Sequence, residues 1–166
     1  MQKRALILAL VIPLLVGSGL YWVFSAQAQS TTSTRSVSGA GTSIVEGGTG
    51  APSFHPVQTT FAFHWSNGQG HFECLALTPS ASPGAAGSGN FDTNVMYVTG
   101  PITSVSVEGT TAVLKGTATV TGLGAGSNVP FTATATSGGP GTTLVLEISG
   151  LTFREIVLAG QITVKG

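Results

Sequence analysis

The chain has 166 residues, of which 42% are hydrophobic and only 7% charged, and its six basic residues balance six acidic ones. Intrinsic disorder combines few apolar residues with a high net charge, and a nucleic-acid-binding surface needs clustered Lys and Arg, so this composition excludes both. Its 24 Gly residues, among many Thr, Ser, Ala and Val, favour strands and turns over surface helices.

The first 28 residues have the organisation of a signal peptide. Lys3 and Arg4 precede an apolar stretch from Ala5 to Phe24, and Ala26-Gln27-Ala28 supplies the small residues that signal peptidases recognise. We predict cleavage after Ala28. The alternative is an uncleaved membrane anchor, because about 20 apolar residues are just enough to cross a bilayer. Both interpretations predict a secreted or cell-surface protein. It would contact the membrane only through this segment, and only if the segment stays uncleaved.

Residues 29–57 are predicted to form a linker rich in Ser, Thr and Gly. Ser30–Thr34 is polar, and Gly47–Pro52 is rich in turn-forming residues. Only Ser43–Val45 shows a short strand pattern within this segment. We therefore expect a flexible spacer between the export segment and a folded domain over residues 58–166.

A β-hairpin is predicted at the start of the folded domain. Apolar and polar residues alternate with the period of a strand on both sides of Asn67-Gly68, and this dipeptide is a strong signal for a two-residue hairpin turn. The turn fixes the register, so it predicts three cross-strand pairs: Phe63 with Phe72, Phe61 with Cys74, and His64 with His71. The apolar residues of both strands then share one face.

Further short strands follow a long Gly/Ser/Ala/Pro loop at Thr78–Asn90. Alternation and turn signals at Gly100-Pro101, Gly109, Gly122–Gly126, Gly138–Gly141 and Gly160 predict strands at Phe91–Val98, Ile102–Val107, Thr111–Thr121, Asn128–Thr136, Thr143–Ser149 and Gln161–Lys165. Leu151–Ala159 is predicted to be a turn followed by a short strand, because Arg154-Glu155 interrupts its alternation. The fold class is all-β, a small antiparallel β-sandwich or barrel of about 7–9 short strands.

The alternation also predicts which side chains form the core. The inward candidates share large apolar side chains or a place on an apolar strand face: Phe61, Phe63, Phe72, Leu114, Ala118, Val120, Phe131, Leu144, Leu146, Ile148, Ile162 and Val164.

The order of several strand motifs suggests a family. These motifs are Thr60–Phe63, Gly70–Glu73, Ile102–Val105, Ala112–Val120, Val129–Ala133 and Gly160–Val164. Together they resemble the post-COAP type of β-domain in exported bacterial proteins. The resemblance implies this fold and export from a bacterial cell but no reaction, since that family has no established activity. Its members often carry acidic residues near 138–142, where this chain has Gly138-Gly139-Pro140-Gly141, so a cation role for such acids is not expected here.

The sharpest candidate for chemistry is a metal site at His64, His71 and Glu73, with His55 as a further ligand. The hairpin register places His64 beside His71 on the outer face, with Glu73 two residues further along. Two imidazoles and a carboxylate can bind Zn²⁺ or Cu²⁺. The alternative is a polar outer face without a ligand. Cys74 faces inward in this register and is expected to be a small buried hydrophobe.

Two rows of threonines are the second candidate: Thr117, Thr119 and Thr121 on one strand, and Thr132, Thr134 and Thr136 on the next. If these strands pair, the rows would form a hydroxyl-covered patch two strands wide that could order water or bind sugars. The simpler interpretation is that Thr suits a solvated strand face.

Catalysis has little support in the sequence. The acidic residues Asp92, Glu108, Glu147 and Glu155 are scattered and are interpreted as solvated strand or turn residues. No G-x-S-x-G elbow is present to carry a nucleophile. We therefore predict an exported non-catalytic β-module with a structural or binding role, whose partner is a carbohydrate or another surface protein and not a nucleic acid. The alternatives are a metal-binding protein using the His/Glu cluster, with Zn or Cu as its cofactor, and a small secreted hydrolase.

Overall fold

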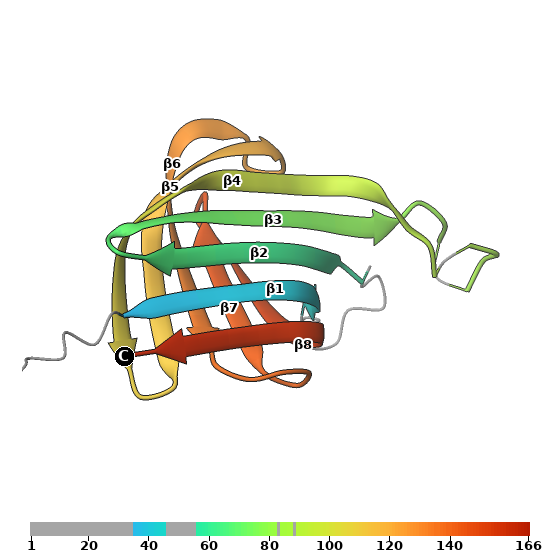
Figure 1. The fold of residues 1–166 in the computed structure, drawn as a ribbon. Coiled ribbons are helices and arrows are strands. Elements are labelled where there is room, and N and C mark those ends of the chain that lie inside the picture. The colour runs from blue at the N-terminus through green and yellow to red at the C-terminus, as the bar shows by residue number, and fades with distance from the viewer. Residues whose placement is uncertain (1–34, 46–55, 83, 88) are drawn as a thin grey trace, which may run out of the picture. The chain divides into compact units, whose positions relative to one another are not determined.

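The structure is a closed barrel of eight antiparallel strands in which each strand pairs with its neighbours in sequence and β8 returns to β1 (Figure 1). It is a computed structural model that describes residues 35–45, 56–82, 84–87 and 89–166. The strands are β1 (Ser36–Val45), β2 (Gln58–Ser66), β3 (Gln69–Pro79), β4 (Phe91–Glu108), β5 (Thr111–Gly122), β6 (Gly126–Thr136), β7 (Thr143–Ile148) and β8 (Leu151–Lys165). The predicted all-β fold class is confirmed, in its barrel form.

The predicted export segment, residues 1–28, lies outside the described residues. In the part of the chain that the structure describes, no helix has the length and apolar character needed to cross a membrane.

The predicted hairpin between β2 and β3 is confirmed in every pair. Phe63 lies opposite Phe72, Phe61 opposite Cys74, and His64 opposite His71. Asn67 and Gly68 adopt φ values of 54° and 78°. A two-residue hairpin turn of type I′ requires these left-handed conformations at both of its residues, and Asn and Gly adopt them most readily.

The linker prediction for residues 29–57 is wrong where β1 forms. Residues 36–45 pair with β2 on one side and with β8 on the other, so this strand closes the barrel. Its alternation was hidden because Gly39 and Ser43 occupy inward positions where a large apolar residue is normally expected. Such small residues carry no hydrophobic signal in the sequence.

The turns predicted at Gly100-Pro101 and at Gly160 are also absent, because β4 and β8 continue through them. A Cβ atom at Gly100 would lie 2.1 Å from the carbonyl oxygen of Thr117, and one at Gly160 would lie 2.1 Å from that of Ala40. These glycines therefore permit a close approach of neighbouring strands, which is the other common role of glycine within a sheet.

The interior of the barrel is filled by side chains. The rings of Phe61, Phe63, Phe72 and Phe131 follow one another at centroid distances of 6.0, 6.1 and 5.1 Å. Such offset and tilted contacts are favoured between aromatic rings. All of the predicted core residues are buried except Val164, which is half-buried at the edge of the core.

The two threonine rows do not form the predicted patch. Strands β5 and β6 pair, but the register places Thr132 opposite Lys115, Thr134 opposite Val113, and Thr117 opposite Pro130. The rows are thus displaced along the strands, and no wide hydroxyl array results.

Candidate functional site

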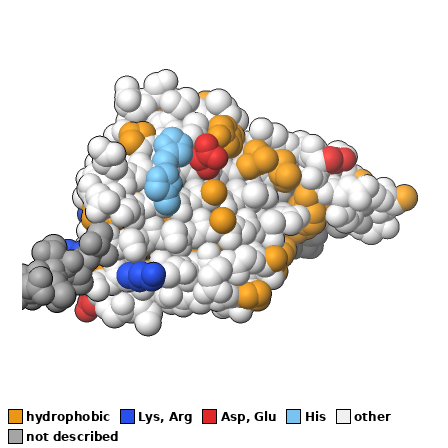
Figure 2. Space-filling model, viewed as in Figure 1, with side chains coloured by type: hydrophobic (Ala, Val, Ile, Leu, Met, Phe, Trp, Pro, Cys, Tyr) orange, Lys and Arg blue, Asp and Glu red, His pale blue; other side chains and the backbone are white. Residues whose placement is uncertain are grey.

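A shallow hollow lies on the outer face of the barrel, across β8, β1, β2 and β3. Its volume is about 690 Å³, and it is lined by Ser38, Gly39, Ala40, Ala62, Phe63, His64, His71, Glu73, Gln161 and Thr163. Figure 2 shows the histidines and an acidic side chain gathered on this face of the molecule, where other charged side chains are few. We call this surface the outer hollow.

Strand register arranges the outer hollow in two rows that run across the four strands. The first row is Thr163, Ser38, His64 and His71, each the direct partner of the next. The second row is Gln161, Ala40, Ala62 and Glu73. Since all these positions have the same alternation parity, their side chains share the outer face.

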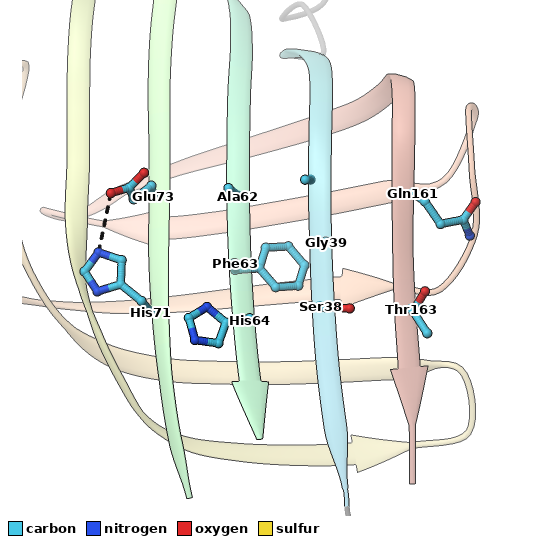
Figure 3. Close-up of a pocket in the computed structure, with 10 residues that line it drawn as sticks. Ser38, Gly39, Ala62, Phe63, His64, His71, Glu73, Gln161 and Thr163 are labelled. Carbon is cyan, nitrogen blue, oxygen red and sulfur yellow. Dashed lines mark ion pairs between the residues drawn. The ribbon is translucent and has the colours of Figure 1, made fainter. Parts of the chain in front are cut away.

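The hollow exists because the middle of the second row is made of alanines. Ala40 and Ala62 are too short to reach the height of Gln161 and Glu73 at either end. Beneath them, Gly39 has no side chain, and the ring of Phe63 lies under β1 in the space a side chain would need (Figure 3). A Cβ atom at Gly39 would lie 2.5 Å from Cζ of that ring. The floor is therefore low and apolar, between polar walls.

His71 is held in place by two neighbours. Its Nε2 atom lies 2.9 Å from Oγ1 of Thr99 on β4 and 3.6 Å from Oε1 of Glu73. The side chains of His71 and Glu73 are 44% and 49% exposed, so water screens this pair and it contributes little to stability. These contacts instead orient the His71 ring, which is turned toward β4 and Glu73, while His64 projects from the next strand (Figure 3).

The structure brings His64, His71 and Glu73 to one face, as the sequence predicted. Among the residues it describes, however, no three His, Cys, Asp or Glu side chains are grouped closely enough to hold a metal ion. His55 lies outside the described residues. Cys74 faces the interior and is buried, which confirms the prediction for it. Metal binding at this face stays a prediction.

A second polar cluster lies inside the barrel, where the sequence predicted none. Oε2 of Glu155 lies 2.5 Å from Oγ of Ser43 and 2.6 Å from Oγ1 of Thr59, and the two hydroxyl groups also contact each other. We call these three residues the inner polar layer. Glu155 is only 1% exposed, so its interpretation as a solvated residue is wrong, whereas Asp92, Glu108 and Glu147 are exposed as expected.

Burial dominates the electrostatics of the inner polar layer. Desolvation raises the pKa of Glu155, and hydrogen bonds from Ser43 and then Thr59 lower it by less. The pKa of the nearby Cys74 thiol is raised well above its usual value, first by burial and then by the charge of Glu155, against a smaller opposite effect of Thr59. The interior therefore favours uncharged forms of both groups.

Ser38, Gln161 and Thr163 were not predicted as parts of the outer hollow, because β1 was not predicted. This strand lies between β8 and β2 and pairs with both, so without it nothing brings β8 to the same face as β2. The burial of Glu155 was not predicted either, although a signal was present: Glu155 shares its alternation parity with Val157, and both are buried.

Comparisons with protein families, curated proteins and solved structures find no match to this chain. The resemblance to the post-COAP type of β-domain therefore stays a prediction, and function must be argued from the geometry alone.

Proposed function

We propose that this chain is an exported, non-catalytic binding module, and that its outer hollow binds an uncharged, hydroxyl-rich ligand of the carbohydrate class. The observation that carries the proposal is the pair of register-aligned rows, which place hydrogen-bonding side chains on both sides of a low apolar floor.

The groups around the floor suit hydroxyl ligands. The hydroxyls of Ser38 and Thr163 both donate and accept hydrogen bonds, the Gln161 amide does the same through separate atoms, and the Glu73 carboxylate accepts. A sugar ring presents hydroxyls around its rim and C–H groups on its faces. Such a ring can direct its hydroxyls to these walls while its apolar face covers Ala40 and Ala62.

The shape and charge of the hollow support the same ligand class. It is open and shallow, unlike the enclosed, mostly apolar pockets that bury drug-like ligands. Among the described residues that line it, Glu73 is the one carboxylate, and there is no Lys or Arg. An anionic ligand would therefore meet repulsion without a permanent positive partner, and a neutral ligand is favoured.

The test is binding of the purified full chain to an array of neutral oligosaccharides. A bound sugar is then titrated against isotope-labelled protein, and we expect amide shifts at Ala40, Ala62 and His64. Glu73→Gln and Gln161→Ala should each weaken binding about tenfold, the effect of losing about one ligand hydrogen bond.

Glu147→Gln is the matched control, since it makes the same change at an exposed position of β7 and should leave binding intact. If no oligosaccharide binds, or if the shifts cluster on β5 and β6, the outer hollow is not a sugar site.

The cross-strand pairing of His64 with His71 favours a second candidate, a Zn²⁺ or Cu²⁺ site. Titration of the full chain with each ion separates the two. Metal binding that is lost in both His64→Ala and His71→Ala would replace the sugar proposal, whereas metal binding unaffected by either change would remove this candidate. Cleavage of a bound oligosaccharide during the titration would instead support the hydrolase alternative.

A further inference from the structure

The inner polar layer lies at the seam where the barrel closes. Ser43 belongs to β1, Thr59 to β2 and Glu155 to β8, and β1 is the strand that joins the two ends of the sheet. The β1–β8 ladder changes register between Thr42 and Ser43, so the backbone pairing is irregular at this level. Side-chain hydrogen bonds therefore reinforce the seam where its ladder is interrupted.

Counting protons shows which form of Glu155 fits this geometry. Three oxygen atoms, Oγ of Ser43, Oγ1 of Thr59 and Oε2 of Glu155, are all in mutual hydrogen-bond contact. Three contacts need three protons, but two hydroxyl groups supply only two. If both donate to an ionised Glu155, the contact between the hydroxyls holds no proton. A carboxyl proton completes the ring, in which each oxygen donates once and accepts once.

The other carboxyl oxygen leads to the same conclusion. Oε1 of Glu155 is buried and has no hydrogen-bond partner among the described residues. In an ionised carboxylate this oxygen would carry half of a negative charge away from water, which is far more costly than burying a neutral carbonyl oxygen. A neutral carboxylic acid is the form that tolerates an unpartnered Oε1.

We propose that Glu155 is a neutral carboxylic acid in the folded barrel, and that its proton locks the seam between β8, β1 and β2. Loss of this proton to solvent leaves the hydroxyls of Ser43 and Thr59 with two protons for three contacts and leaves a negative charge in the apolar interior. Ionisation therefore loosens this part of the barrel, which makes the seam a pH-sensitive conformational switch.

Among the described residues, none supplies a compensating charge to Glu155. Its neighbours are Ser43 and Val45 on β1, Thr59 on β2, Leu144 on β7, and Cys74 on β3. Cys74 is the one titratable group among them, and a thiolate there would repel a carboxylate.

The direction of the pH effect follows from the raised pKa of Glu155. The unfolded chain releases this proton near its usual pKa of 4.5, while the folded barrel retains it to higher pH. The stabilisation is complete below that usual value and is lost as pH rises through the folded-state pKa. In the interval between the two pKa values, the ratio of folded to unfolded chain falls by up to about tenfold per pH unit.

The test is urea unfolding of the full chain between pH 5 and 8, with Glu155→Gln as the variant that cannot ionise and Glu147→Gln as the matched exposed control. We expect the wild type to lose stability relative to Glu155→Gln as pH rises. The difference in the free energy of unfolding between the wild type and Glu147→Gln should stay constant. If the difference in the free energy of unfolding between the wild type and Glu155→Gln did not change with pH, the proposal would be overturned.

A second measurement needs no variant. The ¹³C shift of the Glu155 side-chain carboxyl in the folded wild type reports its ionisation directly. We expect a titration midpoint above 4.5, together with faster amide exchange in β1 and at the start of β8, relative to β4 and β5, once that midpoint is passed. A midpoint at or below 4.5 would show that the folded barrel holds an ionised carboxylate, and the proton lock would not exist.

Discussion

Two glutamates of the same barrel, on strands that β1 and β2 separate, have opposite environments. Glu73 on β3 projects outward, 49% exposed, beside His71. Glu155 on β8 projects inward and is held by two hydroxyl groups. The difference arises from strand parity alone, since successive side chains of a strand point to opposite faces. One glutamate is thereby available to a ligand, and the other is part of the structure that keeps the barrel closed.

The largest expected effect concerns access to the two faces. Cys74 directly follows Glu73 but points inward and is 1% exposed. In the variant Ala62→Cys, a second thiol would lie in the outer hollow. We expect an alkylating reagent to label position 62 at least about a thousandfold faster than Cys74, because Cys74 reacts only from opened molecules. Mass spectrometry of the two peptides measures both rates in one sample.

Urea provides the control for this experiment, since the unfolded chain should label both positions at similar rates. Comparable rates in the native protein would mean that the interior is open to solvent, and the division between the two faces would be lost.

The next largest effect is expected at the inner polar layer. Glu155→Ala removes the hydrogen-bond partner of two buried hydroxyls and leaves a cavity, so we expect a loss of about 3 kcal/mol in the free energy of unfolding. The triple variant Ser43→Ala, Thr59→Val, Glu155→Leu removes all the polar partners together and should be more stable than Glu155→Ala. Denaturant unfolding at pH 5 measures both. If Glu155→Ala were as stable as the wild type, the inner polar layer would contribute nothing to the stability of the seam.

The contrast between these regions also marks what the sequence could predict. The hairpin register followed from Asn67-Gly68 and local alternation, and it placed His64, His71 and Glu73 correctly on one face. The inner polar layer could not be found in this way, because its hydroxyl from Ser43 contacts a carboxyl group 112 residues later. That contact depends on closure of the barrel, and closure depends on β1, whose inward glycine and serine carry no hydrophobic signal.

A smaller loss of stability is expected at Gly39, which lies between the outer hollow and the apolar interior of the barrel. Its outer side contributes to the floor of the hollow, and its inner side contacts the ring of Phe63. In Gly39→Ala the added methyl overpacks against that ring, which Phe61 and Phe72 confine, so we expect a loss of about 2 kcal/mol. Combining it with Phe63→Leu should recover part of the loss in a double-mutant cycle. If the two losses of stability were simply additive, the added methyl group would not be packed against the ring of Phe63.

The smallest effect on stability is expected at Glu73, and this is what makes it informative. Glu73→Ala should change the free energy of unfolding by no more than about 0.5 kcal/mol, because its pair with His71 is screened by water. Thermal unfolding beside Glu147→Ala, an equally simple truncation on the outer face, measures this. If Glu73→Ala nevertheless abolishes sugar binding, the carboxylate serves the ligand and not the fold. If it destabilises the barrel as much as Glu155→Ala does, the two glutamates are both structural, and the case for the outer hollow as a binding surface fails.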